Sequence, residues 1–300
     1  MALFEQLGLI GCGLMGGSFA LALKRAGLVQ RVVGYSKSPS TLHRARELGV
    51  IDVEAPSALL AVSGADLVLL AVPVAATEDT FRAIRHLVTP STLVMDVGST
   101  KADVVAAARR SFKDHLGGFV PAHPIAGKES AGVDHADAQL YQGCQVILTP
   151  TTDTDPAQVV RAQALWTALG SRVRQMAPED HDAAYATVSH LPHLLAFAAM
   201  NAVTGQPQAR QFLDLAGPGF RDFTRIAASD PSVWRDILLA NREEILAQAG
   251  HFRAALEALE NTLSRGDATA LHQLIRTASD ARARWQLGGQ VDAPPHNDSP

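Results

Sequence analysis

A glycine-rich turn near the N-terminus constrains the fold of this chain more than any other feature. The run Gly11-Cys12-Gly13-Leu14-Met15-Gly16 follows a short apolar segment, 7–10, and opens a helical stretch that Gly27 closes. A second apolar segment, 31–35, comes next. In this strand–turn–helix–strand setting, a GxGxxG run is typical of a loop that binds the pyrophosphate of a dinucleotide at a helix N-terminus. The predicted cofactor-binding residues of this turn are Gly11, Gly13, Leu14, Met15 and Gly16.

The first half of the chain continues to alternate between strand and helix patterns. Apolar runs typical of buried strands occur at 66–72, 92–97, 119–121 and 145–149. Ser38 and Pro39 are a favourable N-cap and first residue for one of the intervening helices. Because alternating strands and helices form parallel sheets covered on both faces, we predict a Rossmann-type α/β domain with a doubly wound parallel sheet over residues 1–176.

The second half of the chain has a different pattern. From residue 177 we find helical spacing and no convincing strand, so we predict an all-helical domain at 177–291. Residues 292–300 are polar and proline-rich and predict a disordered tail. In a helix that begins near Asn241, apolar residues recur at heptad spacing, which indicates packing either within the chain or against a second subunit. These residues are Ile245, Ala249, Phe252, Leu256, Leu259 and Leu263.

Composition excludes several classes of function. The 300 residues carry a formal net charge of −4, which does not favour binding to nucleic acid or to an anionic membrane. Cys12 and Cys144 are too few for a disulfide framework or a cysteine-rich zinc site and suit a reducing compartment. We recognise no signal peptide and no apolar stretch of about 20 residues that could span a bilayer. We therefore expect a cytoplasmic protein.

The residues after the second predicted strand bear on the choice of nucleotide. An Asp or Glu about 20 residues past the glycine turn would bind the ribose 2′-hydroxyl of NAD. This chain instead has Ser36, Lys37 and Ser38, which offer hydroxyls, an ammonium group and a helix N-terminus to a 2′-phosphate. We therefore expect NADP to be favoured, with NAD as the alternative. A solvated Lys37 without a role in binding is the competing interpretation.

Polar residues follow two of the later predicted strands. Ser99 comes after the strand at 92–97, and His123 comes after the strand at 119–121. Since ligands bind at the carboxyl edge of such sheets, both side chains are candidates for an active site. An imidazole suits a general base near neutral pH, and Lys128 could face an anion. Alternatively, Ser99 or Thr100 only caps the helix that starts at Lys101.

A histidine pair beside a proline marks the helical half. Ser189 and His193 share a helix face, and Pro192 should kink the helix. Because imidazoles on an apolar helix are costly to bury unless they are satisfied, His190 and His193 favour contact with a ligand. Zinc is an alternative, but we find no third ligand and predict no metal site. Arg225, downstream of Gly217-Pro218-Gly219, suits either a two-point contact with a carboxylate or a surface ion pair.

Taken together, these motifs resemble the prephenate/arogenate (cyclohexadienyl) dehydrogenase family of tyrosine biosynthesis. The resemblance covers nearly the whole chain in order, and the combination is far more specific than any one motif. It runs through the Gly11 turn, Ala71-Val72-Pro73, Val97-Gly98-Ser99-Thr100-Lys101, His123-Pro124-Ile125-Ala126-Gly127, Pro178-Glu179-Asp180-His181-Asp182, Ser189–His193, the 217–225 segment, Asp230-Pro231 and Trp234.

The resemblance implies an NAD(P)-dependent oxidoreductase that acts on CH–CH donors. It would convert prephenate to 4-hydroxyphenylpyruvate, arogenate to tyrosine, or both, with hydride transfer from C4 and loss of the ring carboxylate as carbon dioxide. By resemblance, His123 takes the proton of the C4 hydroxyl and Ser99 orients His123 or that hydroxyl. The other implied roles are carboxylate binding by Arg225, substrate binding by Ser189, His190 and His193, cofactor contacts at Val72 and Pro73, and a homodimer formed through the helical domain.

The chain departs from the family pattern at two positions, and two other functions compete with the one that the resemblance implies. Ser36 stands where the family commonly has an acidic residue, and Pro218 replaces the second of three glycines. A β-hydroxyacid dehydrogenase would need a lysine in its second domain, and this chain has none after Lys128. A non-catalytic NADP-sensing module would not need the polar residues of both halves together.

Overall fold

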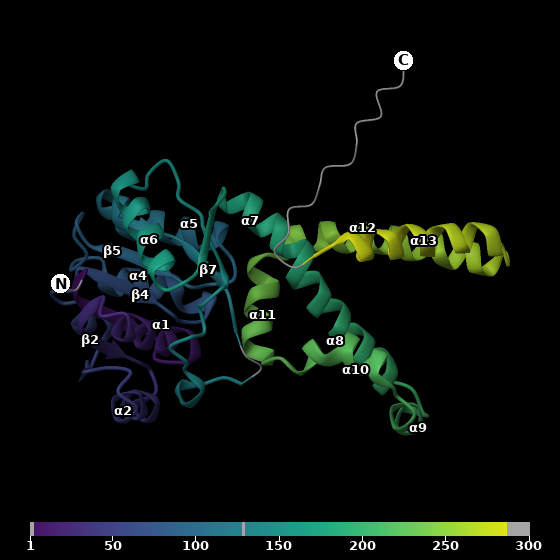
Figure 1. The fold of residues 1–300 in the computed structure, drawn as a ribbon, viewed down its shortest axis with the longest axis horizontal. Coiled ribbons are helices and arrows are strands. Elements are labelled where there is room, and N and C mark those ends of the chain that lie inside the picture. Colours follow the sequence, from purple (N-terminus) through teal and green to yellow (C-terminus); the bar gives the residue numbers. More distant parts are fainter. Residues whose placement is uncertain (1–2, 128–129, 287–300) are drawn as a thin grey trace, which may run out of the picture. The chain divides into compact units, whose positions relative to one another are not determined.

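A six-stranded parallel sheet forms the centre of the first half of the protein (Figure 1). The computed structural model describes residues 3–127 and 130–286. The sheet order is β3-β2-β1-β4-β5-β6, so the chain changes direction between β1 and β4, where sheets of this type bind ligands. The predicted doubly wound parallel sheet is confirmed. Its strands are β1 (Phe4–Ile10), β2 (Val29–Tyr35), β3 (Val53–Glu54), β4 (Leu67–Leu70), β5 (Leu93–Asp96) and β6 (Phe119–Val120).

Helices cover both faces of this sheet. Leu67 and Leu69 of β4 belong to one buried cluster with residues of α1 (Leu14–Arg25) and α6 (Pro156–Ala168). The alternate residues, Val68 and Leu70, belong to a second cluster with α4 (Thr77–Ile84) and α5 (Ala102–Phe112). Burial on both faces explains why the strands are continuous apolar runs. The shorter elements are α2 (Pro39–Glu47), α3 (Ala58–Ala61), η1 (Val74–Ala76), η2 (Lys113–Gly118) and η3 (Val133–His135).

A second, three-stranded sheet carries His123 and departs from the prediction. It contains β7 (Ala122–Ile125), β8 (Gln145–Leu148) and β9 (Arg172–Gln175), in that order. β7 runs antiparallel to β8, and His123 pairs with Ile147. His123 does follow the strand predicted at 119–121, which is β6, but it also lies within a strand of its own, β7, that the sequence did not predict. Proline is rare inside strands, so Pro124 prevented the prediction of β7 from the sequence. The proline is tolerated there because β7 is an edge strand.

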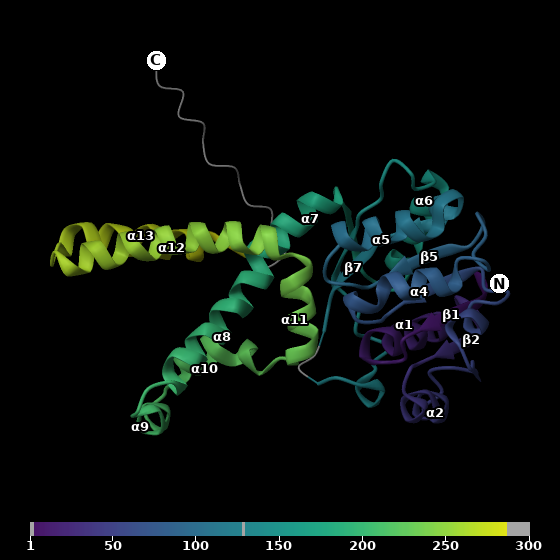
Figure 2. The same cartoon turned by 180° about the vertical axis from the view of Figure 1, so that it is seen from behind.

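Helices make up the described chain after Gln175. They are α7 (Pro178–Tyr185), the π-helical turn η4 (Ala186–His190), α8 (Leu191–Thr204), α9 (Ala209–Asp214), α10 (Pro218–Thr224), η5 (Arg225–Ala228) and α11 (Pro231–Ala240). Helix α11 packs against η1, and η5 packs against α8. Helix α10 also packs against α8, and the two lie side by side in both views (Figure 1 and Figure 2).

Two prolines affect the local structure of this helical segment. Gly217-Pro218-Gly219 does not form a loop: Gly217 is the N-cap of α10 and Pro218 is its first residue, a favourable position for proline. Pro192 lies inside an uninterrupted helical run, 178–204, and the π-helical turn η4 directly precedes it. The α-helical hydrogen-bond pattern is therefore interrupted next to this proline, which has no N–H to donate.

The described chain divides into two compact units between Ile245 and Leu246. The second unit contains most of α12 (Arg242–Ser264) and α13 (Ala268–Arg284). Of the predicted heptad residues, Phe252, Leu256 and Leu263 expose 40%, 43% and 66% of their surface. The predicted tail, 292–300, lies outside the described residues. Within the described ranges, no helix has the length and apolar character needed to cross a membrane.

Candidate active site

The glycine turn has the shape that a dinucleotide phosphate requires. Gly11 has a φ of +97°, and a Cβ on it would lie 2.1 Å from the carbonyl oxygen of Ala71. A Cβ on Gly16 would lie 2.1 Å from the carbonyl oxygen of Gly11, so only glycine fits at either position. A Cβ on Gly13 would meet nothing within 4 Å, which leaves its backbone open to a ligand. The residues present therefore fit the pyrophosphate of NAD or NADP.

Helix α1 begins directly behind this turn. Gly13 is its N-cap and provides no side-chain cap, so the N–H groups of the first turn are available to phosphate oxygens. Leu14 starts the helix, and the hydroxyl of Tyr141 donates to the carbonyl oxygen of Met15 at 2.7 Å. Val72 and Pro73 follow β4, which pairs with β1, so they lie at the same edge of the sheet.

The segment after β2 borders the glycine turn. Gly11 N donates to Tyr35 O at 2.9 Å, which places Ser36 beside the turn. The Ser38 hydroxyl accepts from Thr41 N at 3.3 Å and caps α2, which confirms the predicted N-cap. Lys37 is exposed at the start of this helix. A hydroxyl and an ammonium group therefore lie near the position that a ribose bound in this fold would occupy.

A buried ion pair ties the end of β5 to β7. The Lys101 side chain is fully buried, forms an ion pair with Asp96 and donates to Ala122 O at 2.8 Å. The other Asp96 oxygen accepts from Ala122 N at 3.1 Å. These contacts fix the residue that precedes His123. Ser99 lies half-buried between Asp96 and Lys101 in the same turn.

The surroundings of the His123 imidazole disfavour its charged form. Burial is the main cause that lowers its pKa well below the usual value for histidine. The Lys101 ammonium and the neighbouring imidazoles of His181 and His190 also disfavour a proton on His123. Nδ1 of His123 lies 2.8 Å from Nε2 of His181, and the Tyr185 ring lies 4.9 Å away between centroids. A neutral imidazole is the form that can accept a proton.

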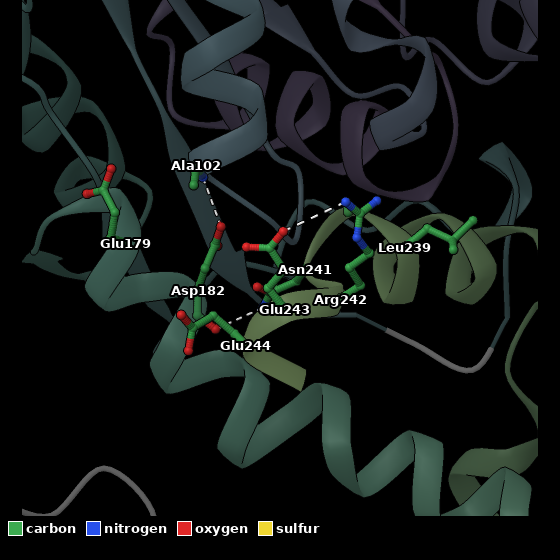
Figure 3. A pocket seen from close by; sticks show the side chains of 9 residues that line it. Ala102, Glu179, Asp182, Leu239, Asn241, Arg242, Glu243 and Glu244 are labelled. Carbon is green, nitrogen blue, oxygen red and sulfur yellow. Dashed lines mark hydrogen bonds and ion pairs between the residues drawn. The ribbon is translucent and has the colours of Figure 1, made fainter. Parts of the chain in front are cut away.

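Asp182 caps α5 from a distant part of the sequence. Its two oxygens accept from Lys101 N and Ala102 N, each at 2.9 Å, and Figure 3 shows the carboxylate pointing at the backbone of Ala102. Asp182 Oδ1 also lies 2.8 Å from His181 Nδ1. The alternative in which Ser99 caps this helix is therefore wrong. Asp182 and Lys101 lie 81 positions apart, so no local sequence signal could have revealed this cap.

Asn241 joins this group to His190 of η4. Its amide Nδ2 donates to Asp182 O at 2.8 Å and lies 3.1 Å from Nδ1 of His190. Burial lowers the pKa of His190 to about 4. Because the Asn241 amide nitrogen can only donate, His190 Nδ1 accepts and Nε2 carries the proton. Nε2 of His190 is buried and has no protein partner among the described residues.

His193 lies between Ser189 and Trp234. Its Nδ1 lies 2.9 Å from Ser189 O, which confirms that these two residues share a helix face. The rings of His193 and Trp234 stack with centroids 3.4 Å apart and planes at 19°. Burial lowers the pKa of His193, and the Arg225 guanidinium lowers it further. Arg225 is exposed at the start of η5, close enough for its charge to act on His193.

One predicted substrate-binding residue, Lys128, lies outside the described residues. In the parts of the chain that the structure describes, no three His, Cys, Asp or Glu side chains are grouped to hold a metal ion. His181, Asp182 and Asn241 were not assigned roles from sequence, although the motif that contains the first two was part of the family resemblance. Their role depends on contacts between elements far apart in the chain.

Comparison with known proteins agrees with this geometry. The family model described as prephenate dehydrogenase, nucleotide-binding domain, matches residues 19–175. The family model described as prephenate dehydrogenase, dimerization domain, matches residues 177–277. Together the two matches span most of the chain and meet where the strands end and the helices begin.

Individual relatives are similar over almost the full length. The cyclohexadienyl dehydrogenase of Zymomonas mobilis is 35% identical, over 94% of this chain and 96% of that protein. The prephenate dehydrogenase of Bacillus subtilis is also 35% identical, over 91% of this chain and 74% of that protein. The crystal structure of the A. aeolicus prephenate dehydrogenase, in complex with hydroxyphenyl propionate and NAD⁺, superposes with a TM-score of 0.87 at 34% identity. That superposition covers 93% of this chain and 97% of the other.

Proposed function

The chain belongs to the prephenate dehydrogenase family, and from this premise we propose that it catalyses the oxidative decarboxylation of prephenate, arogenate or both. The observation that carries the proposal is the neutral, hydrogen-bonded His123, held beside the end of β5 by the Lys101–Asp96 pair. A base at this edge, together with a dinucleotide-shaped turn at the end of β1, is what oxidation of a substrate hydroxyl requires.

His123 acts as the general base in this reaction. The nicotinamide, when bound, accepts the hydride that leaves C4 of the substrate. His123 accepts the hydroxyl proton as the C4 carbonyl forms, and loss of the ring carboxylate as carbon dioxide then makes the ring aromatic. Because the pKa of His123 is lowered, its imidazole is unprotonated and ready to accept this proton at neutral pH. Ser99 orients His123 or the substrate hydroxyl.

The helical half supplies substrate contacts. Nε2–H of His190 is a buried donor without a protein partner among the described residues, which supports a contact with substrate. His193 is fixed by Ser189 O and Trp234, and Arg225 binds a substrate carboxylate through its guanidinium fork. Ser189 and Lys128 complete the proposed set of substrate-binding residues. The α/β half thus binds the cofactor, and the helices after residue 177 contact the substrate.

NADP is the favoured cofactor, with NAD accepted as the alternative. No carboxylate occurs at Ser36, Lys37 or Ser38 to repel a 2′-phosphate. The Ser38 hydroxyl already caps α2, so Ser36 and the exposed Lys37 are the residues left to bind the phosphate. The A. aeolicus prephenate dehydrogenase was crystallised with NAD⁺. Substitutions in the residues after β2 therefore test whether this protein differs from it in its preference for NADP over NAD.

The protein forms a homodimer through its helical half. The match to a family model described as a dimerization domain supports this, as do the exposed apolar residues Phe252, Leu256 and Leu263 of α12. Apolar residues repeated at heptad spacing pack well against a second helix.

A steady-state assay with both substrates and both nucleotides tests the proposed function. Reduced nucleotide is followed by absorbance, and the aromatic product is identified by chromatography. We expect turnover of at least one substrate, with a higher kcat/KM for NADP than for NAD. Failure to oxidise either substrate with either nucleotide, while nucleotide binding is intact, would favour the non-catalytic NADP-binding alternative.

A further inference from the structure

We propose that His181 and Asp182 are positioning residues that hold His123 in a single tautomer and stabilise the positive charge it acquires. The catalytic consequence rests on the proposed function, whereas the hydrogen-bonded row itself does not. The row consists of Asp182, His181 and His123, joined by contacts of 2.8 Å and 2.8 Å. Two of its members lie on α7 and the third lies on β7.

The tautomer follows from the donors and acceptors along the row. Both oxygens of Asp182 accept backbone N–H groups at the N-terminus of α5, so this carboxylate is ionised and offers only acceptors. His181 must therefore donate through Nδ1, which leaves its Nε2 as an acceptor. His123 must in turn donate through Nδ1. The lone pair of His123 then lies on Nε2, the nitrogen that does not face His181.

The same row stabilises the protonated base. When Nε2 of His123 gains the hydroxyl proton, the bond from Nδ1–H to His181 stays in place and becomes charge-assisted. Asp182 is the anion at the end of the row. Burial is the main cause that lowers the pKa of His181, and its hydrogen bond to Asp182 opposes that effect. The catalytic triad of serine hydrolases is arranged in a comparable way, with a carboxylate that orients an imidazole.

Charges on every neighbouring element bear on this row. Lys101, the N-cap of α5, and His190 of η4 both disfavour a positive charge on His123. Asp96 of β5 forms the ion pair with Lys101, and its charge favours a proton on His181. The neutral Tyr185 ring packs against both imidazoles, with centroids 4.9 Å and 4.5 Å away. Asp182 is the anion hydrogen-bonded to the histidine pair, whereas Asp96 is already paired with Lys101.

A purely structural role is the alternative, and the chain offers variants that separate the two. His181→Gln keeps an acceptor oxygen near the position of Nε2, whereas His181→Leu removes it. Asp182→Asn keeps one oxygen for the α5 cap but removes the charge. Asp180→Asn is the matched control, because it makes the same change on an exposed residue of α7.

The imidazole nitrogens of the full-length protein are read by NMR at neutral pH, with His123 assigned by loss of its signal in His123→Asn. We expect Nδ1–H for His123 in the wild type and a mixture of tautomers in His181→Leu. A wild-type His123 protonated on Nε2 would overturn the proposal. This result does not depend on substrate, so an enzyme with the expected tautomer but no turnover would refute the proposed function and leave this inference standing.

Kinetics then measure the effect on catalysis. His181→Leu should lower kcat about 10²-fold, the lower end of what a general base contributes, while KM for substrate and nucleotide changes little. His181→Gln should recover most of this loss. Asp182→Asn should lower kcat and move the acid limb of kcat/KM to lower pH, because loss of an anion lowers the pKa of the histidine pair. A His181→Leu variant with unchanged kcat, or an acid limb that moves no more than in Asp180→Asn, would overturn the assignment.

Discussion

Replacing Lys101 by methionine leaves the buried Asp96 carboxylate without a cation. Methionine preserves the length and volume of the side chain, so no cavity forms. Asp96 keeps its bonds from Gly98 N and Ala122 N, but Ala122 O loses its 2.8 Å donor. Removing one partner of a buried ion pair costs about 3–5 kcal/mol. We expect a loss of this size in the free energy of unfolding, measured by urea denaturation as a lower midpoint at unchanged slope.

Lys24 provides a matched control for this experiment. Its Nζ also donates to a carboxylate and to a backbone carbonyl, Asp52 Oδ1 at 2.7 Å and Gly49 O at 2.9 Å, but the pair is partly exposed to solvent. Exposed pairs are worth about 0–1 kcal/mol, so Lys24→Met should cost far less. The double variant Asp96→Asn/Lys101→Met should recover much of the loss, because no charge remains unpaired. Equal costs for Lys101→Met and Lys24→Met would refute the reasoning from burial.

The same substitution predicts a change in pH dependence. The Lys101 charge is one of the causes that lower the pKa of His123, so its removal should raise that pKa. The unpaired Asp96 carboxylate acts in the same direction. Since only unprotonated His123 can act as the base, the acid limb of kcat/KM should move to higher pH. An acid limb that stays in place or moves to lower pH would contradict the proposed role of His123.

Three further substitutions test the roles of individual residues. His123→Asn should keep nucleotide affinity but lower kcat about 10²–10⁴-fold, because it removes the general base, and unchanged turnover would exclude that role. Arg225→Ala should mainly raise KM for the substrate by removing binding shared by the ground and transition states, and an unaltered KM would assign Arg225 to structure. Ser36→Asp should shift preference towards NAD, measured as the ratio of kcat/KM values, and an unshifted ratio would place recognition of the 2′-phosphate elsewhere.

Local patterns in the sequence determined the fold class and the cofactor loop. The positive φ of Gly11, the N-cap at Ser38 and the apolar run of β4 depend on residues that lie within a few positions of one another. Backbone conformation and hydrophobic period are local properties, so contiguous residues are enough to predict them. His123, Ser189, His190 and His193 were identified in the same way, because their types and spacing are visible in the sequence.

Only the tertiary structure decided what surrounds His123. Its place within β7 depends on pairing with β8, and Pro124 hides that strand from any propensity argument. Asp182 caps a helix that starts 80 residues earlier in the chain, and it orients His181 at the same time. Such partners are set by how helices and strands pack, because a hydrogen bond between distant residues forms only after the chain has brought both to one place. The sequence therefore pointed to His123 as the candidate base, and only the packing showed that His181 and Asp182 lie beside it.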